Sequence, residues 1–213
     1  YVPVGSLAAY QSADQWKEFF HTEEFSPPET PMSLPLSRGW NIFSSPLLLT
    51  EVDLQVIFHP LIAAGVLEKV QDEAGNLLED EGSLGEWMNT IGNWTLTEGY
   101  KVKVTGNCIL PINGTPVAFP LKIPLKPGWN IVSYPKQSPA DALEVVQQLI
   151  DRHSLVKVQD EQGNAIENLG SLGGWQNNIG GFIPGKGYRI KVSTTDTLTV
   201  EDAYLKSGIV PSW

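Results

Sequence analysis

Four tryptophans stand at related positions of the 213-residue chain and carry the most specific chemistry that its residue types suggest: Trp40, Trp87, Trp129 and Trp175. An exposed indole ring can stack on the face of a sugar, and a nearby amide can hydrogen-bond the sugar hydroxyls. An asparagine follows the second and fourth tryptophans by two positions. Our candidate carbohydrate-binding residues are therefore Trp87, Trp175, Asn89 and Asn177.

The same tryptophans also fit a structural role. Trp40 alternates with Ile42, so the two side chains share a face of a strand. Large aromatic side chains at such positions are more often buried than exposed, which favours the core over a sugar platform, most strongly for Trp40 and its counterpart Trp129. The neighbouring Asn41 and Asn130 are expected to hydrogen-bond backbone at a strand end.

An acidic loop supplies the second candidate site. Calcium prefers carboxylate and amide oxygens, and its candidate ligands here are Asp72, Glu73, Asn76 and Glu79. The spacing of an EF-hand loop is absent. The alternative, which we favour, is a solvated turn between two strands, because Gly and Asn accept positive φ.

The residue types give little support to catalysis. The three histidines are His21, His59 and His153, and the last two fall at non-equivalent places in the repeated segments described below. The Gly-Ser-Leu-Gly segments lack the spacing of a nucleophile elbow, and no Cys and His residues have zinc-binding spacing. We therefore predict that the chain is not an enzyme and uses no cofactor.

One long stretch of sequence occurs twice. Gly39-Trp40-Asn41-Ile42 returns as Gly128-Trp129-Asn130-Ile131, 89 residues later, and three further blocks return 88 residues later. Those blocks begin at Lys69 and Lys157, at Gly82 and Gly170, and at Gly99 and Gly187. A period this long indicates a repeated folding unit rather than one layer of a solenoid.

Composition narrows the classes of partner. The net charge is −10, which argues against nucleic acids and anionic membranes because both carry negative charge. The sequence contains no apolar run of about 18 residues, so we predict no membrane insertion. Cys108 is the only cysteine, so no internal disulfide is possible. The first residues show no secretion signal, and the chain resembles a piece of a longer protein.

The elements that would position these residues are mainly strands. Each copy is expected to contain one helix, capped by Thr50 or Ser138, with Pro60 kinking or shortening the first. A third helix is expected near the N-terminus, over 12–20. The expected strands cover 36–44, 67–71, 87–91, 100–105, 108–112 and 117–124, and in the second copy 125–134, 155–159, 175–179, 188–193 and 197–200.

These elements predict an α+β fold that is mostly β. It consists of two homologous antiparallel units, each with one packed helix, in a tandem pseudo-twofold arrangement. The expected division is an N-terminal helix and Pro-rich connector (1–35), a first repeat unit (36–124) and a second repeat unit with a C-terminal tail (125–213). Only Leu125-Lys126-Pro127 separates the last strand of one unit from the first strand of the next, so we expect a rigid junction.

The repeated motifs, taken in order, resemble a known family. Gly-Trp-Asn-Ile-x-Ser-x-Pro, Lys-Val-x-Asp-x-x-Gly and Gly-Tyr followed by a charged strand are similar to the Gly-Trp-Asn-Leu-Ile-Ser-Leu-Pro repeats of large secreted bacterial proteins, many exported by the type IX pathway. The resemblance covers about 36–200. It implies a non-catalytic module at the cell surface that stands beside other domains of the same polypeptide, and it supplies no ligand.

The sequence therefore predicts an extracellular structural, adhesive or spacer module whose partners are neighbouring domains of its own polypeptide. The alternative is a carbohydrate-binding module with a polysaccharide as partner, using Trp87 and Trp175.

Overall fold

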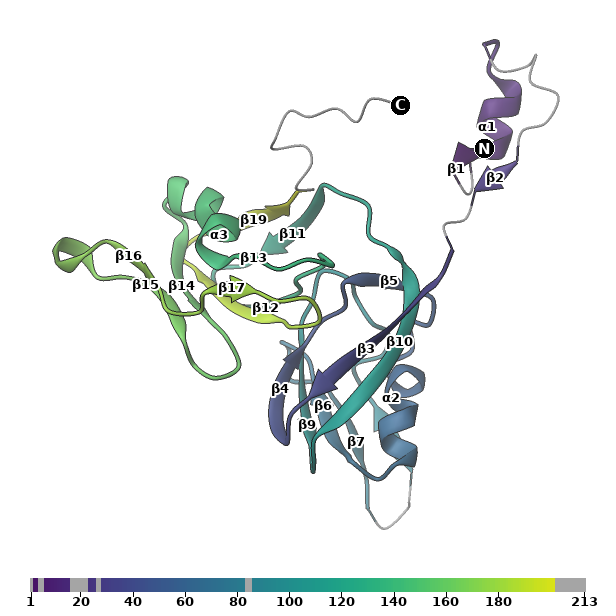
Figure 1. The fold of residues 1–213 in the computed structure, drawn as a ribbon, viewed down its shortest axis with the longest axis horizontal. Coiled ribbons are helices and arrows are strands. Elements are labelled where there is room, and N and C mark those ends of the chain that lie inside the picture. The colour runs from purple at the N-terminus through teal and green to yellow at the C-terminus, as the bar shows by residue number, and fades with distance from the viewer. Residues whose placement is uncertain (1, 4–5, 16–22, 26–27, 83–85, 202–213) are drawn as a thin grey trace.

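The computed structural model describes residues 2–3, 6–15, 23–25, 28–82 and 86–201. This part of the chain is mostly β, with three α-helices and several small antiparallel sheets, which confirms the predicted α+β class (Figure 1). None of its helices has both the length and the apolar character needed to cross a bilayer.

The first unit is built around a five-stranded sheet in the order β4-β9-β6-β7-β8. Helix α2 packs against it, and a smaller sheet in the order β3-β10-β5 completes the unit. The elements are β3 (Thr30–Leu36), β4 (Gly39–Phe43), β5 (Leu47–Leu49), α2 (Leu54–Ala63), β6 (Leu67–Gln71), β7 (Leu77–Asp80), β8 (Trp87–Asn89), β9 (Tyr100–Val104) and β10 (Cys108–Pro116).

The second unit repeats this plan, with a five-stranded sheet in the order β12-β18-β14-β15-β16. Its helix α3 contacts β19, and β19 pairs with β11. The elements are β11 (Leu121–Leu125), β12 (Gly128–Val132), β13 (Ala140–Asp141), α3 (Ala142–Asp151), β14 (Leu155–Gln159), β15 (Ala165–Asn168), β16 (Trp175–Asn177), β17 (Gly181–Phe182), β18 (Tyr188–Val192) and β19 (Asp196–Val200).

The helix caps differ from the prediction. The N-cap residues are Asp53 and Asp141, whose carboxylates accept hydrogen bonds from the second and third backbone N–H groups of α2 and α3. Thr50 and Ser138 were therefore wrong as caps. Each helix starts later than expected because Asp53 and Asp141 first form short β-bridges with the chain at Asn93 and Gly181, which keeps the preceding residues extended.

Helix α2 runs through Pro60 to Ala63, so of the two predicted alternatives at Pro60, a kink or an early end, the early end was wrong. Proline removes one hydrogen bond to the carbonyl four residues before it, here that of Val56. Val56 is exposed, so water can satisfy this carbonyl at little cost. The helix ends before Gly65, whose φ of +65° follows the last turn.

Two strand predictions also need correction. The strand expected over 36–44 is β4 at 39–43, and Leu36 instead ends the separate strand β3; in the second unit Leu125 likewise ends β11 before β12 begins. The sequence Asn113-Gly114 favours a turn between the strands expected over 108–112 and 117–124, but no turn forms there, because β10 runs straight through both residues between β3 and β5. Gly114 is needed there for close approach: a Cβ on it would lie 2.3 Å from the Leu48 carbonyl oxygen.

Helix α1 (Leu7–Ser12) ends at the first residue of the range 12–20 in which the N-terminal helix was predicted, and the described residues 13–15 of that range are not helical. Ser12 ends this helix rather than capping its start, and 16–22 lie outside the described residues. The short strands β1 (Val2–Pro3) and β2 (Glu24–Phe25) pair with each other beside α1 (Figure 1).

Each unit has its own hydrophobic core, and tyrosines lie at the centre of both. Tyr100 and Tyr188 open equivalent strands, and each hydroxyl accepts a hydrogen bond from a backbone N–H, that of Thr95 or Ile183, as a structural role predicts. Tyr100 packs beside Trp94, and Tyr188 stacks on Phe182 with ring centroids 3.7 Å apart.

The buried tyrosines make stability sensitive to alkali. Burial raises the pKa of Tyr100, Tyr134 and Tyr188 from the ordinary value of 10.0 to about 12. The unfolded chain releases these protons near pH 10 while the folded chain keeps them, so their contribution is complete below pH 10 and is lost between 10 and 12. Denaturant titrations at stepped pH should show stability falling across this window. Unchanged stability up to pH 12 would contradict this assignment.

Candidate functional site

Repeated residues from both units meet at the junction between the two units. Strands β4 and β12 are the outer strands of their five-stranded sheets, and a turn of the other unit covers each free edge. The Ile42 carbonyl accepts a hydrogen bond of 2.8 Å from Gly187 N–H, and the Ile131 carbonyl accepts one of 2.9 Å from Gly99 N–H. Each unit thus protects the exposed sheet edge of the other.

A second pair of backbone bonds extends the junction. Ser44 N–H donates to the Gly185 carbonyl at 3.0 Å, and Ser133 N–H donates to the Thr97 carbonyl at 3.2 Å. Ser44 and Ser133 are separated by 89 residues, and Thr97 and Gly185 by 88, the offsets of the sequence repeat. The contacts therefore come in pairs that exchange the roles of the two units.

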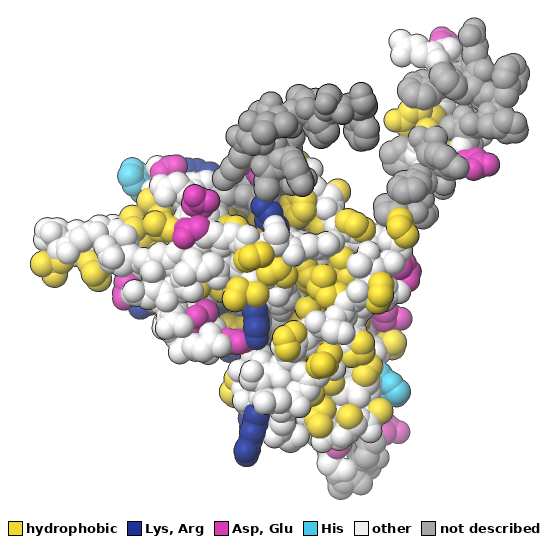
Figure 2. All heavy atoms as spheres, viewed as in Figure 1, with side chains coloured by type: hydrophobic (Ala, Val, Ile, Leu, Met, Phe, Trp, Pro, Cys, Tyr) yellow, Lys and Arg dark blue, Asp and Glu magenta, His cyan; other side chains and the backbone are white. Residues whose placement is uncertain are grey.

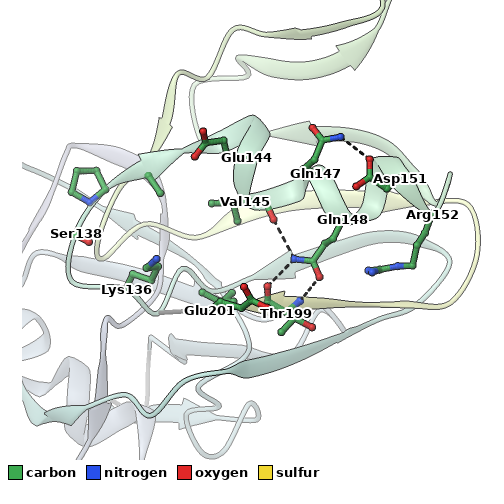
Figure 3. A pocket seen from close by; sticks show the side chains of 13 residues that line it. Lys136, Ser138, Glu144, Val145, Gln147, Gln148, Asp151, Arg152, Thr199 and Glu201 are labelled. Carbon is green, nitrogen blue, oxygen red and sulfur yellow. Dashed lines mark hydrogen bonds between the residues drawn. The ribbon is translucent and has the colours of Figure 1, made fainter. Parts of the chain in front are cut away.

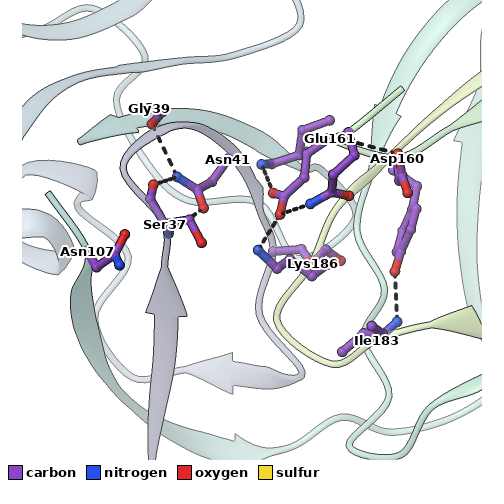
Figure 4. A network of polar contacts seen from close by, with 12 residues as sticks. Ser37, Gly39, Asn41, Asn107, Asp160, Glu161, Ile183 and Lys186 are labelled. Atoms are coloured by element: carbon purple, nitrogen blue, oxygen red, sulfur yellow. Dashed lines mark hydrogen bonds and ion pairs between the residues drawn. The ribbon is translucent and has the colours of Figure 1, made fainter. Parts of the chain in front are cut away.

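The acidic loops also reach across the junction (Figure 4). Glu161 Oε2 accepts a hydrogen bond of 2.9 Å from Ile42 N–H, and Glu73 Oε2 accepts one of 2.6 Å from Ile131 N–H. Glu161 Oε1 also pairs with Lys186 Nζ at 2.6 Å. The position equivalent to Lys186 is Glu98, so the two carboxylate contacts differ in charge balance.

Two glycines allow the turns to approach this closely. A Cβ on Gly99 would lie 2.9 Å from the Val132 carbonyl oxygen, and one on Gly187 would lie 3.1 Å from the same oxygen. The Gly187 Cβ would also meet Ile42 Cγ2 at 2.7 Å. Backbone against backbone at this distance leaves no room for a side chain, which explains why a glycine stands at both positions.

One serine pair provides an internal comparison. Ser44 Oγ donates to the Lys186 carbonyl at 2.7 Å and accepts from Tyr134 N–H at 3.1 Å, both across the junction. Its counterpart, Ser133, is buried, and its Oγ has no hydrogen-bond partner in the part of the chain that the structure describes. Only the first hydroxyl therefore joins the two units.

Ser44→Ala should destabilise the protein by about 1–3 kcal/mol, because it removes the partner of the buried Tyr134 N–H and of the partly buried Lys186 carbonyl. Ser133→Ala is the matched control and should change the free energy of unfolding by less than about 0.5 kcal/mol, since it removes no bond. Urea titrations of both variants measure the difference. Equal losses would show that the cross-unit bonds of Ser44 contribute nothing.

The candidate sugar-binding residues lie at equivalent places in the two units, away from the junction glycines. Trp87 and Trp175 are half-buried and pack against the two cores. Asn89 Nδ2 donates to the Gly92 carbonyl and its Oδ1 accepts from Gly92 N–H. Asn177 makes the same two bonds with Gly180. These amides hold the turns that face the helix N-termini and present no free group to a ligand.

The prediction that Trp40 belongs to the core was wrong, because its side chain is 48% exposed on the outer face of β4. Its counterpart, Trp129, is half-buried, and the Arg189 guanidinium lies 4.5 Å from its ring centroid. No cation is found over Trp40 among the described residues. The neighbouring Asn41 and Asn130 are buried and hydrogen-bond the backbone of residues 37–39 and 126–128, as predicted.

The four candidate calcium ligands each have another partner. Asp72 accepts hydrogen bonds from the backbone and side chain of Asn76, which closes the turn. Glu79 pairs with Lys69 at 2.9 Å, and Glu73 turns to the second unit. Among the described residues, no three His, Cys, Asp or Glu side chains form a group able to hold a metal ion.

Two surface hollows lie elsewhere. One, of about 640 Å³, lies between α3 and β19, where Gln148 already bonds Thr199 and Gln147 already bonds Asp151 (Figure 3). The other, of about 330 Å³, lies by β10 and α2, on the first unit, and exposed apolar residues such as Val56 surround it. Figure 2 shows hydrophobic side chains gathered over β3, β5 and β10. Neither hollow assembles a set of free polar groups.

Sequence reasoning missed the junction residues Glu73, Glu161, Gly99 and Gly187. The signal was their exact repetition: the glutamates occupy the same place in both Asp-Glu-x-Gly-Asn loops, and the glycines precede both tyrosines. A solvated turn needs no glutamate at a fixed place, so its repetition pointed to a contact. No protein family matches the chain, and neither characterised proteins nor solved structures include a significant match.

Proposed function

We propose that this chain is a non-catalytic, extracellular structural module that holds the segments on either side of it at a fixed separation. The observation that carries the proposal is the reciprocal junction, in which the backbone of each unit closes the sheet edge of the other. Such a junction removes the hinge that a short linker would otherwise leave. It suits a spacer better than a pair of independently moving domains.

The distribution of free chemical groups supports a non-catalytic role. Asn41 and Asn130, two buried polar side chains at equivalent places in the repeat, spend their hydrogen bonds on the nearby backbone of Ser37 and Lys126. The proposed extracellular location rests on the resemblance of the repeats to those of secreted bacterial proteins. The partners would then be the neighbouring domains of the same polypeptide.

Differential scanning calorimetry of the purified chain tests the spacer role. A spacer of coupled units should unfold in a single transition whose calorimetric and van't Hoff enthalpies agree. Two resolved transitions would mean that the units unfold independently, and the proposal would fail. A second experiment incubates the purified protein with chromogenic ester, glycoside and peptide substrates. Turnover that co-purifies with the protein would also overturn the proposal.

A further inference from the structure

A groove of about 540 Å³ runs between the two units, on the outer faces of their five-stranded sheets. Trp40 and Lys101 line it from the first unit, and Arg189 and the loop at Asp160 line it from the second. Gln71 and Gln159, which are equivalent in the repeat, also line it. The volume lies within the usual range of small-ligand sites, roughly 300–1,000 Å³.

Some polar side chains of this groove already have hydrogen-bond or ion-pair partners, and others have none among the described residues. The Asp160 carboxylate accepts hydrogen bonds from Gln162 N–H, Asn164 N–H and Asn164 Nδ2. Glu161 pairs with Lys186 and bonds Ile42 N–H. Glu161 and Lys186 neutralise each other, and Asp160 keeps its negative charge while it holds the loop. Lys101 and Arg189 therefore outweigh the one unpaired carboxylate of the groove, so its local charge is opposite to the net charge of the chain.

The free groups are cations and amides. Within the described residues, neither Lys101 nor Arg189 forms an ion pair, and the amides of Gln71 and Gln159 make no side-chain hydrogen bond. Strand pairing places Gln71 opposite Lys101, and Lys101 opposite Ile42, which shares its face of β4 with Trp40. The free groups of the first unit thus stand on the same face as its exposed indole.

The two copies contribute differently to the groove. Trp129 is covered by Arg189, a contact that fixes the guanidinium over the ring, whereas Trp40 has an open face. A flat apolar ring beside two amides and two cations matches one class of ligand. The ring stacks on a pyranose, the amides bond its hydroxyl pairs, and the cations bond a carboxylate, with Arg suited to bidentate contact.

We propose that this groove binds an acidic polysaccharide, a chain that contains uronic acid residues, with Trp40 as the stacking platform and Lys101 and Arg189 as carboxylate ligands. The site requires both units, because Trp40 and Arg189 come from different copies. This activity goes beyond the spacer role and uses different side chains from Trp87 and Trp175. The spacer role would stand without it.

The test is isothermal titration of the full chain with a trimer of galacturonic acid, and in parallel with a trimer of galactose, its neutral counterpart. We expect millimolar or tighter binding of the acidic trimer and at least about tenfold weaker binding of the neutral one. Trp40→Ala should weaken binding of the acidic trimer about tenfold, with partial recovery in Trp40→Phe, and Lys101→Gln should weaken it several-fold.

The controls distinguish a loss of ligand binding from a loss of folding. Trp40 and Lys101 lie on the outer face of the sheet, so the melting temperatures of their variants should stay within a few degrees of the parent. Lys122→Gln removes an exposed charge on β11, outside the groove, and should leave binding unchanged. No heat with the acidic trimer at millimolar concentration, equal affinity for both trimers, or full binding by Trp40→Ala would each overturn the assignment.

Discussion

Replacing Gly187 by alanine is expected to uncouple the two units. The added methyl would lie 2.7 Å from Ile42 Cγ2 and 3.2 Å from the Phe43 carbonyl oxygen, both in the first unit. The turn must move away, which breaks the bond from Gly187 N–H to the Ile42 carbonyl. We expect a loss of about 3 kcal/mol in the free energy of unfolding, and calorimetry should resolve two transitions where the parent shows one.

Gly106→Ala is the matched control for this substitution. No atom lies within 4 Å of the position that its Cβ would take, and its φ is not positive. Alanine there should be neutral or should stabilise the chain by up to about 1 kcal/mol, because it restricts the unfolded state. If Gly187→Ala and Gly106→Ala gave the same single transition and the same stability, the glycine contact would not couple the units.

Removing the Glu161 carboxylate should have the second-largest effect. Glu161→Ala takes away the acceptor of Ile42 N–H and leaves Lys186, whose side chain is 25% exposed, without its partner. Breaking a largely buried charge-assisted pair costs about 3 kcal/mol or more, which corresponds to roughly 6–12 °C in melting temperature for a chain of this size. Thermal and urea unfolding measure the loss.

Two comparisons within the chain sharpen this prediction. Glu73→Ala removes the equivalent bond to Ile131, but Glu73 is exposed and pairs with no lysine among the described residues, so it should cost less, about 1–2 kcal/mol. Glu167→Ala breaks a partly exposed pair with Lys157 and should cost less than about 1 kcal/mol. The order Glu161, Glu73, Glu167 is the expected result, and a loss at Glu167 as large as that at Glu161 would contradict it.

The strands that follow a strict period of two were predictable from the sequence almost to the residue. In β9 and β18 buried and half-buried residues alternate strictly, because one face of each strand lies on a core. Strands β6 and β14 also begin and end at the predicted residues, although a bulge after Leu67 and Leu155 interrupts their alternation. Gly114 shows the limit of local reasoning. An Asn-Gly pair is a strong turn signal, yet here the glycine lets β10 pass close to Leu48, a contact between residues 66 positions apart that no local window contains.

The candidate site was harder to predict than the fold. The exposure of Trp40 depends on which part of the β4 surface the second unit covers. The sequence specifies that side chains alternate between the two faces of the strand, but not what packs on each face. Glu161 could not be assigned from the sequence, because its partner, Ile42 N–H, is a backbone group that carries no sequence signal. The repetition of the glutamates and glycines was a signal that the sequence analysis did not use, and only the structure showed what these residues contact.

The central claim is that the two units form one rigid body. Residual dipolar couplings of backbone amides in the full chain test it directly, with alignment tensors fitted separately to 39–104 and 128–192. The claim predicts tensors of equal magnitude whose axes coincide when the structure is used as it stands. Tensors that differ in magnitude, as independently tumbling domains produce, would contradict it.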